Sequence, residues 1–354
     1  MQGKLPEGWD ANLPSFSSDD GPLATRVASE KVINAIAPHL PALIGGSADL
    51  DPSTHNQMKG LGDFQNPARA EGDQQGSAGG GWSYAGRNLH FGVREHAMGA
   101  IVNGMAAHGG ALPFGATFLI FSDYMRPSIR LAALMKLHLI YIFTHDSIAL
   151  GEDGPTHQPV EHLVSLRAIP HLLVIRPADA NEATAAWRVA VEQKERPVAL
   201  VFTRQKLPIL PLAKYNDIPL GARSGGYVIS HAERKGEPDI ILVATGSEVH
   251  LALESQEKLS QKGIQARVVS LPCWKLFEEQ PEEYQNKVLP PQVPILAIEA
   301  GSPLGWKSYV GPHIDVIGVD RFGASAPGKI VMDKYGFNVD NVVEHVEAIL
   351  EKHD

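Results

Sequence analysis

The chain has 354 residues, of which 44% are hydrophobic and 20% charged, as in a globular protein long enough for two domains. Its formal net charge of -9 gives no general field for nucleic acid or an anionic membrane, so an anionic ligand needs a local basic cluster. The single cysteine, Cys273, excludes an internal disulfide framework and favours a reducing compartment. The amino-terminal stretch lacks the apolar core of a signal peptide, and no apolar run approaches the roughly 20 residues of a membrane span. We therefore expect a cytoplasmic protein that contacts no membrane.

Short apolar runs alternate with amphipathic stretches along the first part of the chain. The apolar runs are bounded by Gly, Pro or Asp and predict buried strands, whereas the amphipathic stretches predict helices. Asp179 or Asn181 is expected to cap the second of these helices. The predicted strands are 41–46, 137–143, 171–177 and 197–203, and the predicted helices are 24–40 and 178–195.

The same alternation restarts after a proline-containing stretch at 207–226. Predicted strands at 239–246, 266–271, 294–301 and 314–320 are accompanied by predicted helices at 247–263 and from Asp340 onward. This pattern predicts an α/β protein with two domains, each a mostly parallel sheet flanked by helices. We expect 1–20 and 208–222 to be linkers, and 21–207 and 223–354 to be the two domains.

The segment HDSIALGEDGPTHQP, residues 145–159, crowds ionisable groups into a Gly- and Pro-rich turn after a predicted strand. It contains His145, Asp146, Glu152, Asp153 and His157. Open α/β folds bind ligands at the carboxyl ends of their strands, so this segment is a candidate site. The alternative is a solvated loop whose Asp and Gly residues only make turns. The residues alone leave both open.

A predicted helix at 92–110 places Glu95, Met98, Val102 and Met105 on one face. A carboxyl group at the head of a buried apolar stripe would be desolvated, which favours its protonated form. The alternative is an ordinary first-turn glutamate that interacts with the positive end of the helix.

The stretch 111–126 carries Phe114, Phe118, Phe121 and Tyr124, a spacing more typical of a core than of a cofactor platform. His157 and His162 are five residues apart, which is poor zinc spacing, and the chain has no HExxH or CxxC motif. We therefore predict no metal site made by this chain alone.

Four segments together resemble the transketolase family: 145–159, GGSADL at 45–50, GVREHAMGAI at 92–101 and TRQ at 203–205. The resemblance covers essentially the whole chain but only two of the family's three domains. It implies a thiamine-diphosphate pyrimidine-binding fold for 21–207 and a transketolase C-terminal domain for 223–354. The family's diphosphate-binding domain carries a Gly-Asp-Gly motif followed by an Asn, and this sequence has no such motif. Magnesium or calcium is therefore expected from that other domain, not from this chain.

The resemblance assigns cofactor roles to five residues. Glu95 matches the glutamate that hydrogen-bonds the aminopyrimidine ring of thiamine diphosphate and activates it. Phe118, Phe121 and Tyr124 match the aromatic pocket around that ring, and Asp49 matches a further residue of the cofactor pocket.

The resemblance also implies a sugar phosphate site. Asp153 matches a residue that accepts a hydrogen bond from a hydroxyl of the ketose, and His145 and His157 match groups that line the sugar channel and relay protons. The residues that match the phosphate-binding cluster are Arg26, Ser53, His145 and Arg204. Guanidinium groups suit phosphate because their planar fork donates two hydrogen bonds. Ala149 and His96 depart from the common family residues, but neither has an assigned role.

The implied activity is transfer of a two-carbon ketol unit between ketose and aldose phosphates. The expected partner is a diphosphate-binding domain, either a separate subunit or another part of a longer protein, in a homodimer or heterotetramer. We expect the isolated chain to be inactive. Alternatives are a non-catalytic binding or assembly protein, a dehydrogenase beta-type subunit, or a deoxyxylulose phosphate synthase-like subunit; the 151–159 and 203–205 segments disfavour the last two.

Overall fold

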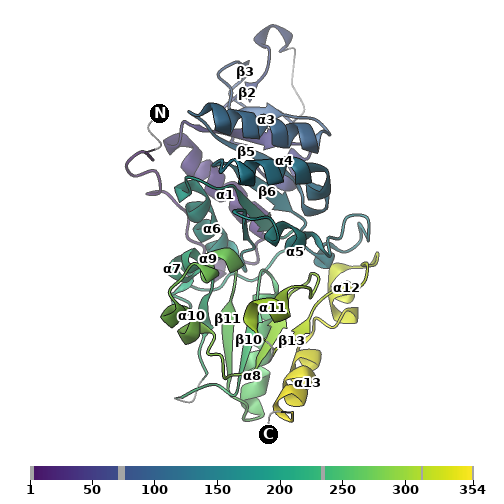
Figure 1. Cartoon of the computed structure of the whole chain (residues 1–354). Coiled ribbons are helices and arrows are strands. Elements are labelled where there is room, and N and C mark those ends of the chain that lie inside the picture. Colours follow the sequence, from purple (N-terminus) through teal and green to yellow (C-terminus); the bar gives the residue numbers. More distant parts are fainter. Residues whose placement is uncertain (1–3, 71–75, 233–235, 312–313, 353–354) are drawn as a thin grey trace.

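The computed structural model describes residues 4–70, 76–232, 236–311 and 314–352. Figure 1 shows two α/β domains stacked one on the other; the first carries strands β1 to β8 and the second carries β9 to β13. Positions 1–3 of the predicted amino-terminal linker lie outside the described residues. Within the described ranges, no helix is both long enough and apolar enough to cross a bilayer. The predicted two-domain α/β architecture is confirmed.

The first domain is built on an eight-stranded parallel sheet of order β3-β2-β4-β1-β5-β6-β8-β7. Every residue of β5, β6 and β8 is buried, which explains why the sequence around β6 and β8 is a largely apolar run; β5 was not predicted as a strand. The strands are β1 (Leu43–Ser47), β2 (Asp63–Phe64), β3 (Trp82–Ser83), β4 (Asn88–His90), β5 (Leu112–Phe118), β6 (Ile140–Thr144), β7 (Leu173–Ile175) and β8 (Val198–Phe202).

Helices cover both faces of this sheet. Buried side chains of α1 and α6 pack on one face, and those of α3, α4 and α5 pack on the other. Asp179 caps α6, because its Oδ1 accepts a 2.8 Å hydrogen bond from the Glu182 N–H. The helices are α1 (Thr25–Ile36), α2 (Asp51–Thr54), α3 (Glu95–His108), α4 (Ser122–Leu134), α5 (His162–Arg167) and α6 (Ala180–Glu192), with 3₁₀ turns at Ser18–Asp20, Ala37–His39, Pro67–Arg69, Leu119–Phe121 and Ile148–Leu150.

The second domain has a five-stranded sheet of order β13-β12-β10-β11-β9, parallel except for β9. Helices α8, α12 and α13 pack on one face, and α9, α10 and α11 on the other. The last helix begins at Val339, one residue before the predicted start, because the Asn338 side chain caps it. The elements are β9 (Tyr227–Ser230), β10 (Ile240–Ala244), β11 (Ala266–Ser270), β12 (Ile295–Ile298), β13 (Ile314–Ile317), α7 (Ile218–Gly221), α8 (Glu248–Gln261), α9 (Trp274–Glu278), α10 (Glu282–Val288), α11 (Trp306–Val310), α12 (Gly328–Lys334) and α13 (Val339–Leu350), with a 3₁₀ turn at Ala222–Ser224.

Side chains of the two domains pack together in shared apolar clusters. Cys273 and Leu276 of the second domain belong to the apolar cluster beneath α1 and α6, and Ala178 and Ala185 belong to the main cluster of the second domain. Within the predicted linker, the Leu210 N–H donates to Asp179 Oδ2 at 2.9 Å. The two domains are therefore in close contact, and this contact fixes their relative orientation.

Candidate active site

The site lies at the carboxyl edge of the first sheet, because the central parallel strands end level with one another. Phe118, Thr144 and Phe202, the last residues of β5, β6 and β8, are register partners, and Ser47 at the end of β1 pairs with Ala116 of β5. The loops that follow these strands therefore meet at one edge. They include the 145–159 segment and most of the residues that the family resemblance singles out.

An aromatic pocket of about 520 Å³ opens at this edge. Phe121 lies between Phe118 and Tyr124, with ring centroids 5.8 and 6.1 Å away and planes inclined by 12° and 25°. Such a row of roughly parallel rings can pack against a flat heteroaromatic ligand. The pocket is lined by Ala48, Leu50, Val93, Glu95, Phe118, Phe121, Tyr124 and His157.

Glu95 is the only acidic residue among the described residues that line this pocket. It is the first residue of α3 and is 8% exposed, and it heads a stripe in which Met98 and Val102 are fully buried and Met105 is partly buried. The predicted apolar face of the helix is therefore confirmed. A nearly buried carboxyl group beside aromatic rings can hydrogen-bond a ring nitrogen of a ligand.

Phe114 does not belong to the pocket. It lies within β5 with no exposed surface and packs in the core, whereas Phe118 ends that strand and Phe121 and Tyr124 follow it. The four aromatic residues thus divide between core and pocket.

His145 connects the pocket to a group of basic side chains. It follows β6 with φ 60°, is 3% exposed, and its Nδ1 lies 2.9 Å from Thr144 Oγ1. Burial, together with the charges of Arg26 and Arg204, lowers the pKa of His145 to about 3. The imidazole is therefore neutral at physiological pH and offers one donor and one acceptor.

Arg26 has unused hydrogen-bonding capacity. Its Nη1 donates to the Ser53 carbonyl oxygen at 2.7 Å, but its buried Nε has no hydrogen-bond partner among the described residues. Burial and the charge of Arg204 lower the pKa of Arg26, while Asp153 opposes this effect. Two guanidinium groups that repel each other, one with an orphaned donor, are suited to bind an anion between them.

The structure places the remaining predicted residues around these two groups. Ser53 contributes its backbone carbonyl to Arg26, and Asp153 and Arg204 are exposed. Asp49 is exposed with φ 65° and is not among the pocket residues, although its neighbours Ala48 and Leu50 are. Leu50, Val93 and His55 also belong to the site but were not predicted as site residues; His55 adds to the positive charge around His145. No local pattern singles out these three residues.

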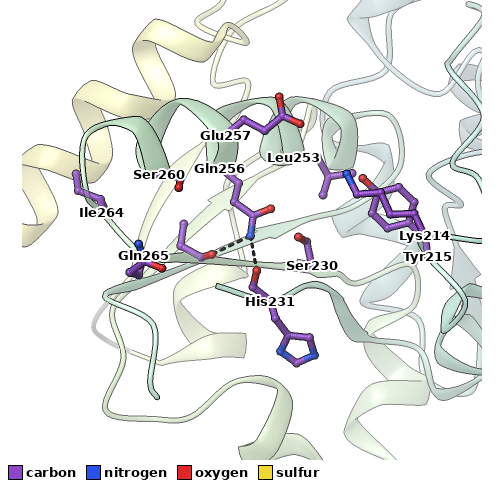
Figure 2. Close-up of a pocket in the computed structure, with 11 residues that line it drawn as sticks. Lys214, Tyr215, Ser230, His231, Leu253, Gln256, Glu257, Ser260, Ile264 and Gln265 are labelled. Atoms are coloured by element: carbon purple, nitrogen blue, oxygen red, sulfur yellow. Dashed lines mark hydrogen bonds between the residues drawn. The ribbon is translucent and has the colours of Figure 1, made fainter. Parts of the chain in front are cut away.

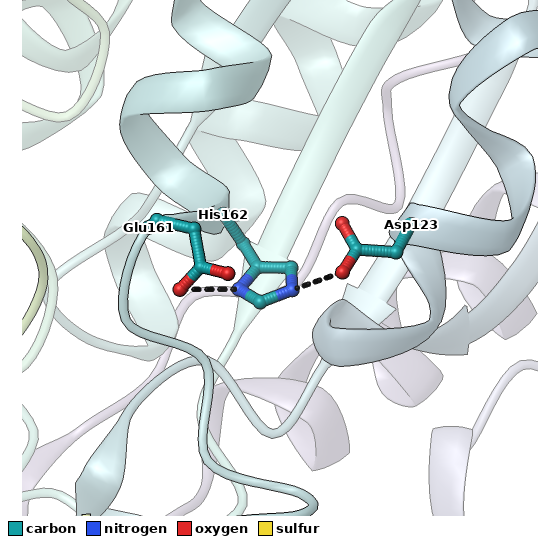
Figure 3. Close-up of side chains that lie close together, drawn as sticks. All are labelled: Asp123, Glu161 and His162. Atoms are coloured by element: carbon teal, nitrogen blue, oxygen red, sulfur yellow. Dashed lines mark hydrogen bonds and ion pairs between the residues drawn. The ribbon is translucent and has the colours of Figure 1, made fainter. Parts of the chain in front are cut away.

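A possible metal site lies on the outside of the first domain. Asp123, Glu161 and His162 are close together, as Figure 3 shows, and His162 is 2% exposed. Its Nε2 is 3.1 Å from Asp123 Oδ2, and its Nδ1 is 3.9 Å from Glu161 Oε2. The two carboxylates face different ring nitrogens, so the arrangement fits a histidine paired with acids better than a chelate.

A second pocket, of about 230 Å³, lies in the second domain beside α8 (Figure 2). Gln256 crosses it and donates to the backbone oxygens of His231 at 3.1 Å and Ala266 at 2.9 Å. Ala266 is the first residue of β11, so this pocket lies at the amino end of that strand. Ligands of open α/β sheets bind at the opposite edge, and we assign no function to this pocket.

The fold and the site together define a two-domain α/β protein in which an aromatic pocket adjoins a group of basic side chains at a sheet's carboxyl edge. Residues 21–209 match the family described as "Transketolase, pyrimidine binding domain", and 225–338 match "Transketolase-like TK C-terminal domain". The chain belongs to the transketolase family, as its motifs predict.

Similar proteins are longer than this chain. It is 54% identical to the transketolase of Geobacillus stearothermophilus and 49% identical to that of Bacillus subtilis, over 99% of this chain and 50% of each relative. A crystal structure of Pichia stipitis transketolase with sedoheptulose-7-phosphate has a TM-score of 0.90 and 44% identity, over 99% of this chain and 49% of that one. The chain thus spans about half the length of the relatives it matches.

A shorter relative has the same fold. The structure described as a split gene transketolase, an inactive beta4 tetramer, has a TM-score of 0.68 and 23% identity to this chain. The match covers 94% of this chain and 99% of that one. At this identity the comparison shows the shared fold alone.

Proposed function

We propose that this chain is a transketolase module that transfers a two-carbon ketol unit between ketose and aldose phosphates in the cytoplasm. It supplies the pyrimidine side of a thiamine diphosphate site and most of the sugar phosphate site. The observation that carries the proposal is the direct contact between the aromatic pocket and the basic group: Phe118 lines the pocket, and its ring contacts that of His145, beside Arg26 and Arg204.

The pocket fits an aminopyrimidine ring. Phe121 and Tyr124 offer ring faces, and the nearly buried Glu95 offers the carboxyl group. When bound, thiamine diphosphate supplies the acidic thiazolium carbon on which this carbon–carbon bond chemistry depends. Glu95 would hold a proton at its carboxyl group toward a ring nitrogen of the bound cofactor. The aromatic side chains fix the ring's orientation and exclude water.

The loops beyond this pocket bind the sugar phosphate. Arg26 and Arg204 bind the phosphate, with the neutral His145 as an additional donor. His157, whose ring lies 5.7 Å from that of Phe121, faces the reacting end and relays protons. Asp153, exposed in the same loop, accepts a hydrogen bond from a ketose hydroxyl.

A diphosphate-binding domain other than the two domains of this chain must hold the diphosphate and its metal ion. Mg²⁺ and Ca²⁺ prefer several oxygen ligands, whereas Glu95 is the only carboxylate among the described pocket residues. Apolar side chains with 48–67% of their surface exposed stand on the neighbouring helices α3 and α4, namely Ile101, Leu131 and Leu134, as expected of a surface that a partner covers. A homodimer or heterotetramer with a diphosphate-binding domain, from a separate subunit or a longer protein, would complete the site.

Calorimetry of the isolated chain tests this proposal. We expect weak binding of thiamine diphosphate that Mg²⁺ does not strengthen, and no ketol transfer. Adding a polypeptide that contains the diphosphate-binding domain should restore cofactor binding and activity together. Tight, magnesium-dependent binding by the isolated chain would contradict the proposed division of the site.

A further inference from the structure

A buried ion-pair network joins the candidate site to the second domain through Arg176. This residue follows β7 and has no exposed surface. Its Nε lies 2.9 Å from Oδ2 of Asp146, the residue after His145. Its Nη1 donates to the carbonyl and hydroxyl oxygens of Thr245, at 2.9 and 3.0 Å, and pairs with Glu248. One guanidinium thus connects the site loop to the turn between β10 and α8.

The second-domain side of this network is itself fixed. The Ala300 N–H donates to Glu248 Oε2 at 2.9 Å, and Thr245 Oγ1 donates to Glu299 Oε1 at 2.5 Å. Glu299 also accepts two hydrogen bonds from Arg167 of the first domain, at 2.7 and 2.8 Å. Arg176 therefore binds groups that cannot easily shift.

Stability alone does not explain such a network. Withdrawing charges from water is costly, and apolar side chains of similar volume often stabilise a fold as well or better. What a buried guanidinium bound to several partners does provide is a fixed geometry for those partners. Asp146, 1% exposed, is the partner on the site side.

His145, the neighbour of Asp146, needs such a support. Its φ of 60° is in the left-handed region, which is unfavourable for a residue with a Cβ and persists only when its surroundings hold it. The ring is held by Thr144 and Phe118, and the backbone on its other side leads directly to the anchored Asp146.

The far end of the same loop also rests on the second domain. Gln158 Nε2 donates to Ala324 O at 3.0 Å and to Gly151 O at 2.8 Å. A Cβ on Gly328 would lie 2.2 Å from Ala149 O, so backbone meets backbone there. The second domain therefore supports the loop at both ends, with Arg176 beside His145.

We propose that Arg176 is a positioning residue: by tying Asp146 to Thr245 and Glu248, it makes the C-terminal domain fix the conformation of His145. The inference rests on the proposed function only in giving His145 a role at the phosphate. Its structural part is tested without substrate or activity.

The test follows the resonances of the His145 ring by nuclear magnetic resonance in isotope-labelled full chains. The ring current of the neighbouring Phe118 displaces these resonances from the positions of a free imidazole, and this ring-current displacement is the quantity measured. Asp146→Ala removes the anchor but leaves Arg176 bound to Thr245 and Glu248. We expect this variant to lose the ring-current displacement. Asp146→Asn keeps an oxygen acceptor for Arg176 and should retain the wild-type resonance. Arg176→Lys keeps a charge but loses the fork that reaches three partners, and should also lose the displacement.

Tyr227→Phe is the matched control. It removes a different buried contact between the domains, the 2.6 Å hydrogen bond from Tyr227 to Glu182, and should lower the melting temperature without moving the His145 resonance. A wild-type resonance in folded Asp146→Ala or Arg176→Lys would overturn the proposal, and so would an equal loss of the ring-current displacement in Tyr227→Phe. Titrating inorganic phosphate into the wild-type chain tests the proposed function separately: no response of His145 would contradict its phosphate role, whatever the variants show.

Discussion

The rings of Phe118 and His145 are in close, tilted contact, with their centroids 3.7 Å apart and their planes inclined by 31°. Phe118 ends β5 and His145 follows β6, and these strands are neighbours in register. The contact joins the ring pocket to the basic group. A ligand that fills the pocket and extends along the sheet edge must therefore pass this pair of rings.

Replacing Glu95 by Gln should reduce ketol transfer by about 10²–10⁴-fold in the reconstituted enzyme, the usual cost of losing a positioned proton-transfer group. Deuterium exchange at the thiazolium carbon should slow in parallel, and the melting temperature should change little. Glu152→Gln, at an exposed position in the 145–159 loop, is the control and should leave exchange unchanged. A wild-type rate of deuterium exchange in Glu95→Gln would contradict the assignment of Glu95 as the group that activates the cofactor.

Replacing Arg26 or Arg204 by Ala should raise the KM for phosphorylated sugars by roughly 10- to 100-fold, because a charge-assisted hydrogen bond contributes about 1.5–3 kcal/mol. The KM for hydroxypyruvate, which has no phosphate, should change much less. Lys206→Ala removes a nearby exposed positive charge and controls for general electrostatics. Equal losses with both donors would indicate a structural role for the arginines instead.

Asp153→Ala should weaken discrimination between ketose donors that differ in hydroxyl configuration next to the carbonyl. A hydrogen bond to a charged acceptor contributes about 1.5 kcal/mol or more, so roughly tenfold of selectivity is at stake. Steady-state kinetics with epimeric donors measures this, with Glu152→Ala as the neighbouring control. Selectivity that survives the substitution refutes the role.

Acid should destabilise the chain partly through His145. Its folded pKa of about 3 lies below the unfolded value of about 6.5, so between these pH values the unfolded state binds more protons. This contribution to the free energy of unfolding is therefore present above pH 6.5 and is lost as pH falls toward 3, by at most about 1.4 kcal/mol per pH unit.

Chemical denaturation between pH 3 and 6.5 measures this effect. The free energy of unfolding should fall less steeply with falling pH in His145→Asn than in the wild type. Asn tolerates a positive φ, so the backbone should be kept. His171→Asn is the control, because His171 is exposed and has a similar φ of 64°. If the free energy of unfolding depends on pH equally in the wild type and in His145→Asn, the lowered pKa of His145 is contradicted.

Most of the longer strands and the site loop could be predicted because their signals are local, whereas β2, β3, β4, β5 and β9 were not predicted. The run before His145 is mostly apolar because every residue of β6 is buried, and the site's ionisable residues begin where that strand ends. The aromatic series from Phe114 to Tyr124 could not be assigned in the same way. It crosses from a strand through a 3₁₀ turn into α4, so its spacing does not indicate one common face.

The contacts between the domains could not be predicted from the sequence. Asp146, Arg176 and Glu248 are far apart in the chain, and each alone looks like an ordinary polar residue near a strand end. Their association depends on the tertiary contact between β10–α8 and the first sheet. The family resemblance indicated the residues expected to contact the ligand, but it did not indicate the residues that fix the positions of those side chains.

The close approach of Gly151 and Gly328 limits how this protein can be recombined. A Cβ on Gly151 would lie 2.7 Å from the Gly328 nitrogen, and one on Gly154 would lie 2.1 Å from Ser325 Oγ. Chimeras that exchange the C-terminal domain between relatives must therefore carry the 323–328 segment and the 149–158 loop as a matched pair. A junction that separates them would force the halves apart at the substrate loop, even if each half kept its own core.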